Sequence, residues 1–251
     1  MKLLNNKIIK NLRDLIGLKP IYMDTDDIKN ASSVSDAFLW RTENNFKTIF
    51  RFTDLLKVFY KIQESDAEIV FLNKNGKKIK SIENFNIKTL NEIIVDNKFL
   101  DGLEDYGTFH IFHRTKNLLK EKIILSNRCY LGFSQNNNLP SFVHGNTYAV
   151  SKEFNNDQQS SNIIKNSFYF NKDYKIQNFF DDSDKIEIFL SNPTSTKIKF
   201  SINDKFYLLE KFCSIMIDVS FLKEINIKSN CYFLRPTIFN WKKEFLDVYH
   251  G

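Results

Sequence analysis

Short alternations of apolar and polar residues follow one another along the chain from residue 34 onward. Residues 37–41, 48–52 and 167–170 are examples, and aromatic and β-branched residues are frequent in them. Such runs, separated by turn residues about every eight to twelve positions, are typical of antiparallel β-sandwiches. The pattern therefore predicts an all-β fold.

Residues 2–16 follow a different period. Their leucine and isoleucine residues recur at helical spacing, with lysine, asparagine and arginine between them, and Gly17 and Pro20 end the run. We predict a short amphipathic helix within residues 1–20. We expect its apolar stripe either to dock on the rest of the protein or on a partner protein, or to lie on a membrane surface, since its polar face is basic.

A strand-turn-strand pattern occurs twice, in residues 68–80 and 187–199, at a constant offset of 119 residues. The matching residues include Glu68 with Glu187, Asn73 with Asn192, and Ile79 with Ile198. The match resumes further on at an offset of 122, where it places residues 108–113 over residues 230–235. A repeat of this length predicts two structural units that share one arrangement of strands.

We accordingly predict two tandem antiparallel β-sandwich units, over residues 34–150 and 165–251. The strands are expected to persist between the copies while the turns diverge, because loop tips tolerate change. Residues 126–150 match neither copy. This segment is therefore where we expect a function to have been added to the duplicated scaffold.

Three segments rich in asparagine predict turns. Asn75-Gly76 separates the two strands of the first copy, and both residues tolerate the positive φ that a type I′ hairpin turn requires. Glu43-Asn44-Asn45 lies between two strand-like runs and predicts a second hairpin. Residues 135–138 contain three asparagines and predict a third.

The composition is ordinary for a globular protein, with 42% hydrophobic and 26% charged residues, although the aromatic share of 15%, including 25 Phe, is high. Much of the net charge of +6 lies in residues 1–20, which hold five basic residues and one acidic residue. The remainder is nearly neutral, and the chain contains no recognised nucleic-acid-binding motif. We therefore expect no nucleic acid partner.

Three cysteines without CxxC spacing indicate neither a disulfide framework nor a structural zinc site. No apolar run approaches the ~20 residues of a membrane-spanning helix, and the N-terminal segment lacks the uninterrupted apolar stretch of a signal peptide. These features predict a cytoplasmic protein.

The chain contains no nucleophile elbow, phosphate-binding loop or dinucleotide fingerprint, so we expect no catalytic residue, no cofactor and no bound metal. An alternative is a metal-dependent enzyme that uses His110, His113 or His144. His110 and His113 are three residues apart on a predicted strand, however, which places their side chains on opposite faces. The sequence favours a protein that is not an enzyme, without deciding the matter.

Two stretches, residues 35–42 and 126–148, combine aromatic residues with arginine, asparagine and histidine. Aromatic faces beside such donors suit sugar rings and hydroxyl groups, and a few polar groups among aromatics are typical of small-ligand sites. A structural alternative is an aromatic core closed by the turn at residues 135–138. The predicted ligand-binding residues are Trp40, Arg41, Arg128, His144, Asn146 and Tyr148.

The predicted function is a non-catalytic β-sandwich binding or interaction protein, with a saccharide or a similar polar molecule as its ligand. Beside the metal-enzyme hypothesis stands a third one, a scaffold that binds a protein partner through residues 2–16. None of these hypotheses specifies the ligand, and each depends on which side chains converge in the folded protein.

Overall fold

The computed structural model describes residues 28, 30–116, 123–127, 129–145, 148–154, 160–162, 172–177, 183–194, 196–229, 231 and 234–251. Nearly all regular elements in these segments are strands, which confirms the predicted all-β fold. The exceptions are the helical turn η2 (Glu43–Asn45) and the helix α2 (Leu55–Tyr60), which Asp54 caps by accepting a hydrogen bond from the Lys57 N–H. The helix predicted within residues 1–20 lies outside the described residues.

In the described segments the strands form five sheets of four strands each, which we name A to E. Sheet A has the strand order β12-β11-β1-β8, sheet B β2-β7-β4-β5, sheet C β10-β9-β3-β6, sheet D β13-β18-β15-β16, and sheet E β17-β14-β19-β20. β1 and β8 are parallel, whereas the other described pairs are antiparallel. The strands are β1 (Ser32–Asp36), β2 (Phe38–Arg41), β3 (Phe46–Phe52), β4 (Asp66–Asn73), β5 (Lys78–Asn86), β6 (Asn91–Val95), β7 (Tyr106–Arg114), β8 (Ile124–Asn127), β9 (Tyr130–Gln135), β10 (Ser141–His144), β11 (Tyr148–Glu153), β12 (Ser160–Asn162), β13 (Lys172–Gln177), β14 (Lys185–Ser191), β15 (Ile198–Ile202), β16 (Lys205–Leu209), β17 (Ser214–Asp218), β18 (Glu224–Ser229), β19 (Thr237–Lys242) and β20 (Phe245–His250).

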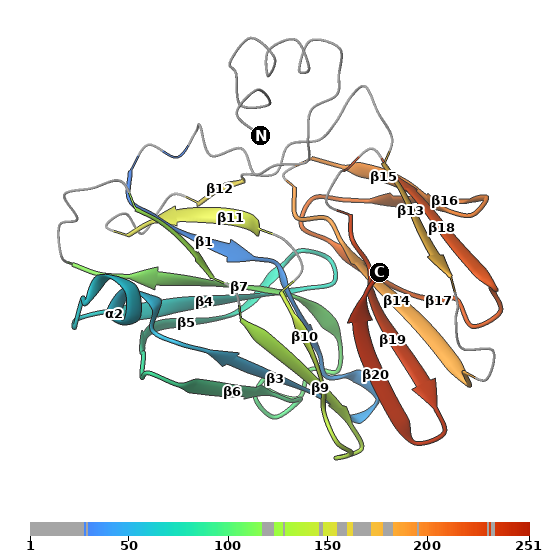
Figure 1. Ribbon diagram of the computed structural model, residues 1–251, viewed down its shortest axis with the longest axis horizontal. Helices are drawn as coiled ribbons and strands as arrows, with labels where there is room; N and C mark the ends of the chain where they lie inside the picture. Colours follow the sequence, from blue (N-terminus) through green and yellow to red (C-terminus); the bar gives the residue numbers. More distant parts are fainter. Residues whose placement is uncertain are drawn as a thin grey trace, which may run out of the picture.

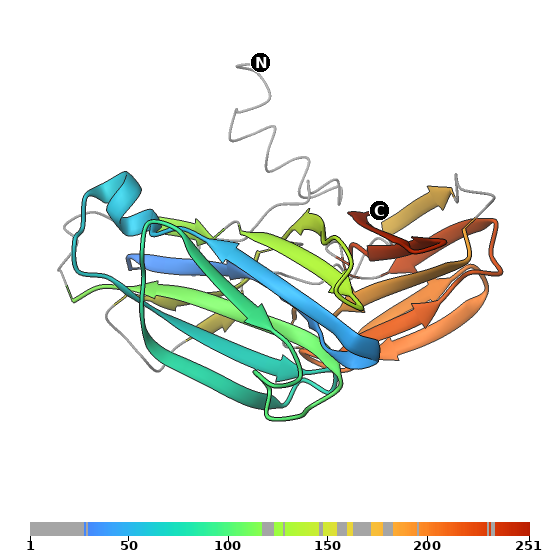
Figure 2. The same ribbon diagram turned by 90° about the horizontal axis from the view of Figure 1, so that it is seen from below.

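Strands β1 to β12 gather on one side of the molecule and strands β13 to β20 on the other (Figure 1). We call these the first and the second group of sheets. Sheet E lies at the boundary, where β20 packs beside β9 and β10, and β17 beside β7. The view from below shows the two groups next to each other along the long axis (Figure 2). Sheet E therefore connects the two groups.

The two inner strands of sheet E, β14 and β19, are largely buried on both faces, which joins the two groups through a continuous core. Phe189 of β14 packs into the aromatic core of the first group, whereas Ile188 and Leu190 pack into the core formed with sheet D. Because successive strand residues point to opposite faces, a strand covered on both sides needs apolar side chains at nearly every position. Residues 186–190 meet this requirement, and only Glu187 interrupts the apolar run.

Strands β1 and β2 are one run of chain that changes sheets at Ala37, from sheet A to sheet B. In β1, which precedes Ala37, serine side chains rather than backbone carbonyls accept hydrogen bonds from the backbone N–H groups of β7. Ser33 Oγ accepts from the His113 N–H at 3.0 Å, and Ser35 Oγ accepts from the Ile111 N–H at 2.9 Å. Serine at alternate positions of this buried strand therefore satisfies the backbone of its neighbour.

The two copies of the repeated pattern do not fold alike. In the first copy, β4 and β5 form a hairpin within sheet B. In the second, β14 lies in sheet E and β15 in sheet D, so the chain between them crosses from one layer to the next. The later match fails as well, because residues 108–113 lie in β7 whereas the described residues among 230–235 lie in no strand.

Residues 126–150, which match neither copy of the repeat, are part of the sheets of the first group. They contain β9, which occupies an inner position of sheet C between β3 and β10. Sheet C could not form without this segment. The expectation that a function was added there stays a prediction, and one turn of the segment lines the candidate site.

The predicted turns form with partly different geometries. Asn75-Gly76 closes the β4–β5 hairpin, but of the two residues only Gly76 has a positive φ, 72°, so the turn is not type I′. Glu43–Asn45 closes no hairpin, because β2 and β3 belong to different sheets. The hairpin predicted at residues 135–138 is confirmed, since β9 pairs with β10 around it.

Candidate functional site

A polar hollow of about 350 Å³ opens at one end of the first group of sheets, where three loops meet. The loops are η2 between β2 and β3, residues 96–105 between β6 and β7, and the turn at residues 136–138 between β9 and β10. Most of the lining side chains are polar. The lining residues are Thr42, Asn45, Phe46, Lys47, Asp96, Asn97, Glu104, Asn136 and Asn137.

Asparagine builds two of the three loops, because it tolerates the left-handed backbone conformation better than most residues. The φ angles are 53° at Asn44, 60° at Asn45, 52° at Asn136 and 63° at Asn137. The two turns also bind each other. The Asn136 N–H donates to the Asn45 carbonyl at 3.3 Å, and Asn45 Nδ2 donates to Asn136 Oδ1 at 3.2 Å. One wall of the hollow is thus a pair of interlocked turns.

The loop at residues 96–105 is fixed by side chains that bind backbone groups. Asp96 Oδ1 accepts from the Phe99 N–H at 2.8 Å, which orders the start of the loop. Thr42 Oγ1 donates to the Leu103 carbonyl at 2.7 Å and so holds the end of the loop against the start of η2. The walls of the hollow are therefore set by the protein's own hydrogen bonds.

The polar groups that face the hollow are amides, carboxylates and one lysine. Lys47 Nζ donates to Asn137 Oδ1 at 2.6 Å, whereas Asn97 and Glu104 have no side-chain partner within the described part of the chain. Amides both donate and accept hydrogen bonds, and carboxylates accept only. Because Asp96 and Glu104 outweigh Lys47, the lining disfavours an anion. It is suited to a neutral ligand with several hydroxyl groups.

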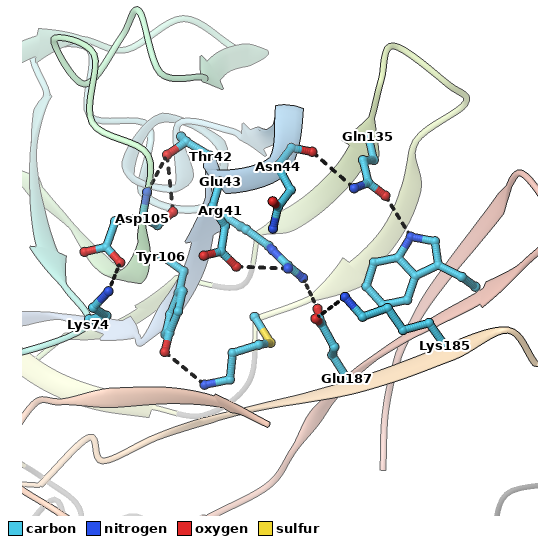
Figure 3. A network of polar contacts seen from close by, with 12 residues as sticks. Arg41, Thr42, Glu43, Asn44, Lys74, Asp105, Tyr106, Gln135, Lys185 and Glu187 are labelled. Atoms are coloured by element: carbon cyan, nitrogen blue, oxygen red, sulfur yellow. Dashed lines mark hydrogen bonds and ion pairs between the residues drawn. The ribbon is translucent and has the colours of Figure 1, made fainter. Parts of the chain in front are cut away.

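Next to the hollow, a buried arginine joins the two groups of sheets (Figure 3). The Arg41 side chain is 2% exposed, and its guanidinium nitrogen atoms lie 2.9 Å from Glu43 Oε1 and 2.7 Å from Glu187 Oε2. Lys185 Nζ lies 2.6 Å from the other carboxylate oxygen of Glu187. The guanidinium also lies over three aromatic rings, those of Phe46, Phe239 and Trp241. These contacts compensate a charge that would be costly to bury alone.

Gln135 links this junction to the turns that line the hollow. Trp241 Nε1 of β19 donates to Gln135 Oε1 at 2.8 Å, and Gln135 Nε2 donates to the Asn44 carbonyl at 3.1 Å. Tyr106 makes a further contact between the groups, since its hydroxyl accepts from the Met216 N–H at 3.2 Å, and burial raises the pKa of this hydroxyl. The hollow and the junction therefore belong to one polar network (Figure 3).

Two of the predicted ligand-binding residues are inaccessible in the folded protein. Trp40 is fully buried in the core of the first group, where Nε1 donates to the Leu72 carbonyl at 2.8 Å. Arg41 is enclosed in the junction. A ligand in the hollow touches neither residue, although Arg41 lies one residue from Thr42 in its wall.

The other predicted residues also lie apart from the lining of the hollow, or are not described. His144 is exposed on β10, where its ring lies 4.7 Å from the ring of Tyr130. Arg128 and Asn146 lie outside the described residues, and the side chain of Tyr148 in β11 is not described. The structure does not bring Trp40, Arg41 and His144 together, and a role for the rest of the set stays a prediction.

The two histidines of the metal hypothesis are buried in β7. Burial lowers the pKa of His110 and of His113 to about 4, an effect that Asp54 and Asn127 partly offset at His113, so both rings are neutral near pH 7. His110 Nδ1 lies 3.2 Å from the carbonyl oxygen of Asp36. Across the described segments, no three His, Cys, Asp or Glu side chains are grouped closely enough to hold a metal ion.

Comparison with known proteins gives no match, either to a family model, to a curated protein or to a solved structure. Within the described residues, no helix is long and apolar enough to cross a membrane. What can be said of function therefore depends on the geometry of the chain itself, an all-β protein with a polar hollow beside the junction of its two groups of sheets.

Proposed function

We propose that this protein is a non-catalytic binding protein that holds a saccharide, or a similarly hydroxyl-rich small molecule, in the polar hollow. The supporting observation is the hollow, a space of about 350 Å³ toward which amide and carboxylate side chains converge from three loops. Ligand sites for small molecules commonly begin at about this volume. Each sugar hydroxyl both donates and accepts, which matches a lining of four asparagines.

The internal order of the hollow adds to this proposal. Binding is tighter when the site is ordered before the ligand arrives, because less conformational entropy is lost on association. Here Gln135 connects the asparagine turns to Trp241 of the second group. The second group of sheets thus acts as a support for the site, and the cytoplasm, where the three free cysteines would stay reduced, is its proposed location.

The other two hypotheses have less support. The metal-dependent enzyme lacks a candidate metal cluster among the described residues. The scaffold hypothesis depends on residues 2–16, which lie outside the described residues, and it stays a prediction.

The first experiment is a glycan array of neutral and charged mono- and oligosaccharides, followed by thermal unfolding of the protein with each sugar that binds. A ligand at a hundredfold excess over its Kd stabilises the folded protein by about 2.7 kcal/mol, which raises the midpoint of thermal unfolding measurably. The absence of both array binding and thermal stabilisation overturns the proposal.

Two pairs of variants locate the site. Asn97→Ala and Glu104→Gln change exposed lining side chains that have no partner within the described structure, so folding should be unaffected. Each should weaken sugar binding by roughly tenfold, which corresponds to the loss of one hydrogen bond. Asn75→Ala and Glu83→Gln are the matched controls, because both residues are exposed outside the hollow. Equal effects in both pairs would place the site elsewhere.

A further inference from the structure

The outer face of sheet C carries apolar and aromatic side chains that the core does not use. Burial alternates along β3, where Phe50 is buried and Arg51 exposed, and the strand register places Tyr130 of β9 on the same outer face as Arg51, opposite to buried Leu131. On this outer face Tyr130 is 53% exposed, Ile94 47% and Phe142 38%. The solvent face of an antiparallel sheet is normally polar, so this apolar content needs an explanation.

Pairing registers place these side chains in two rows across all four strands. One row contains His144, Tyr130, Arg51 and Glu92, and the next contains Phe142, Gly132, Ile49 and Ile94. The guanidinium of Arg51 lies over the Phe142 ring, 4.9 Å from its centroid, and its Nε donates to Glu92 Oε2 at 2.7 Å. The face thus combines ring surfaces with charged hydrogen-bonding groups.

Gly132 gives the face its shape. The ring of Phe142 fills the space above this glycine, and a Cβ atom at position 132 would lie 2.7 Å from Phe142 Cε1. Any other residue would therefore push the ring away from the sheet. Because Gly132 has no side chain, the Phe142 ring can lie close against the sheet, next to the other side chains of the outer face.

The face leads directly to the polar hollow. Lys47 lies two residues before Ile49 on β3, so it points outward in the next row, and its Nζ is bound to Asn137 in the lining of the hollow. From Arg51 to Lys47 the strand advances by four residues, a distance of roughly 13 Å. A molecule that occupied both the hollow and this face would be longer than a single sugar ring.

We infer that the outer face of sheet C binds the continuation of a neutral oligosaccharide whose end lies in the hollow. This inference rests on the proposed function and names its ligand class. The C–H groups on a sugar ring pack against the electron-rich faces of aromatic rings, and its hydroxyl groups bind side chains such as Glu92 and His144. The combined charges of face and hollow are nearly balanced, with Lys47 and Arg51 against Glu92, Asp96 and Glu104, which suits an uncharged chain.

The test uses the sugar that binds on the array, prepared as oligosaccharides of one to six units. Calorimetry measures how the affinity depends on the number of sugar units. In the wild-type protein the affinity should rise by roughly tenfold or more along the series. Tyr130→Ala and Phe142→Ala should abolish this gain while monosaccharide binding is retained, and Tyr130→Phe should restore most of it. Phe206→Ala is the control, because Phe206 is an exposed aromatic residue on sheet D, away from sheet C.

The outcomes separate the two proposals. An affinity that is independent of chain length and unchanged in Tyr130→Ala overturns the role of sheet C and leaves the hollow as the site. No binding of any sugar overturns both. Reversible dimerisation that is lost in Tyr130→Ala, measured by analytical ultracentrifugation, would assign the face to a second copy of the chain and would also overturn the inference.

Discussion

Glu68 and Glu187 occupy matching positions in two similar segments, and both are largely buried carboxylates that bind a cation from a neighbouring sheet. Glu68 of sheet B pairs with Lys152 of sheet A and lies 4.0 Å from Arg114. Glu187 of sheet E pairs with Arg41 of sheet B, across the junction of the two groups. The local sequence therefore provides an ion pair between sheets in both copies, while the rest of the chain determines which two sheets the ion pair joins.

In two more matched pairs, the residue of the second copy is more deeply buried than its counterpart in the first. Asn73 binds the backbone of an exposed hairpin turn, whereas Asn192 is buried and donates to the carbonyls of three residues. Ile79 is partly buried and Ile198 fully buried. The second copy is thus more deeply enclosed at each of these positions, and substitutions in matched pairs test how much that difference stabilises the fold.

The largest difference is expected between Arg41→Met and Lys152→Met. Removing Arg41 leaves Glu187 buried with only the half-exposed Lys185, and breaking a buried ion pair in this way costs about 3–5 kcal/mol. Removing Lys152 costs less, because Glu68 keeps Arg114 nearby. Urea unfolding followed by tryptophan fluorescence measures both.

The double variant Arg41→Met, Glu187→Met serves as the control for this prediction. Replacing both members of a buried pair removes the uncompensated charge, so the double variant should recover most of the lost free energy of unfolding. Equal losses for Arg41→Met and Lys152→Met would contradict the view that the tie at Glu187 is the more enclosed of the two.

A somewhat smaller difference is expected between Ile198→Ala and Ile79→Ala. Ile198 is 0% exposed in the core of sheets D and E, so its truncation leaves a cavity and costs about 3 kcal/mol of unfolding free energy. Ile79 only packs against the edge of the first core, and truncation there should cost about 1 kcal/mol, in proportion to its smaller burial. Chemical denaturation measures the free energy of unfolding of each variant. Ile198→Val, which removes a single methyl group at the buried position, is the control and should cost less than Ile198→Ala.

Acid should act on the first group through its buried histidines. The pKa of His110 and of His113 is about 4 in the folded protein and 6.5 in an unfolded chain, so the unfolded chain binds protons first. Stability is therefore complete above pH 6.5 and falls as the pH is lowered toward 4. Between pH 6.5 and pH 5 each histidine accounts for about 2 kcal/mol.

Measuring the free energy of unfolding across this pH interval checks the prediction, because most carboxylates stay ionised there. A double variant with His110→Gln and His113→Gln should show a much flatter dependence on pH. An unchanged slope in the double variant would show that other groups cause the loss. His250 in the second group is only partly buried and should contribute less.

The elements of the fold could be predicted from local pattern, because strands and turns are set by alternation and by residues such as asparagine. Their pairing could not. The chain from β14 to β15 has a hairpin-like sequence, yet β14 pairs with β17 and β19, and its side chains are buried on both faces. Pairing depends on apolar surfaces that are distant in sequence, and no local signal specifies them.

For the candidate site too, the local turns could be predicted from the sequence, but the contacts between them could not. The turns at Glu43–Asn45 and at residues 135–138 were recognisable, but nothing near them in the sequence indicates that Asn45 meets Asn136. Trp40 and Arg41, an aromatic residue beside a cation, match the local pattern of a ligand site. In the structure they fill a core and a junction, because Glu187, the partner that accounts for the buried arginine, lies far along the chain.

The smallest effects are expected at the matched pair Asn73 and Asn192. In this pair, the same residue type binds the backbone of an exposed turn in one copy and buried carbonyl groups in the other. Asn192→Ala removes a buried amide that donates to the Thr196, Leu209 and Glu210 carbonyls, so these acceptors lose a partner and the free energy of unfolding falls by about 2 kcal/mol. Asn73→Ala should cost about 0.5–1 kcal/mol, because water replaces the lost bonds at an exposed turn. Asn192→Asp keeps the acceptor for the Thr194 N–H but places a buried carboxylate oxygen against three carbonyl oxygens, so it should cost at least as much as Asn192→Ala. If Asn73→Ala proved the more damaging variant, the exposed turn would be the more important of the two, and the greater enclosure of the second copy would not translate into stability.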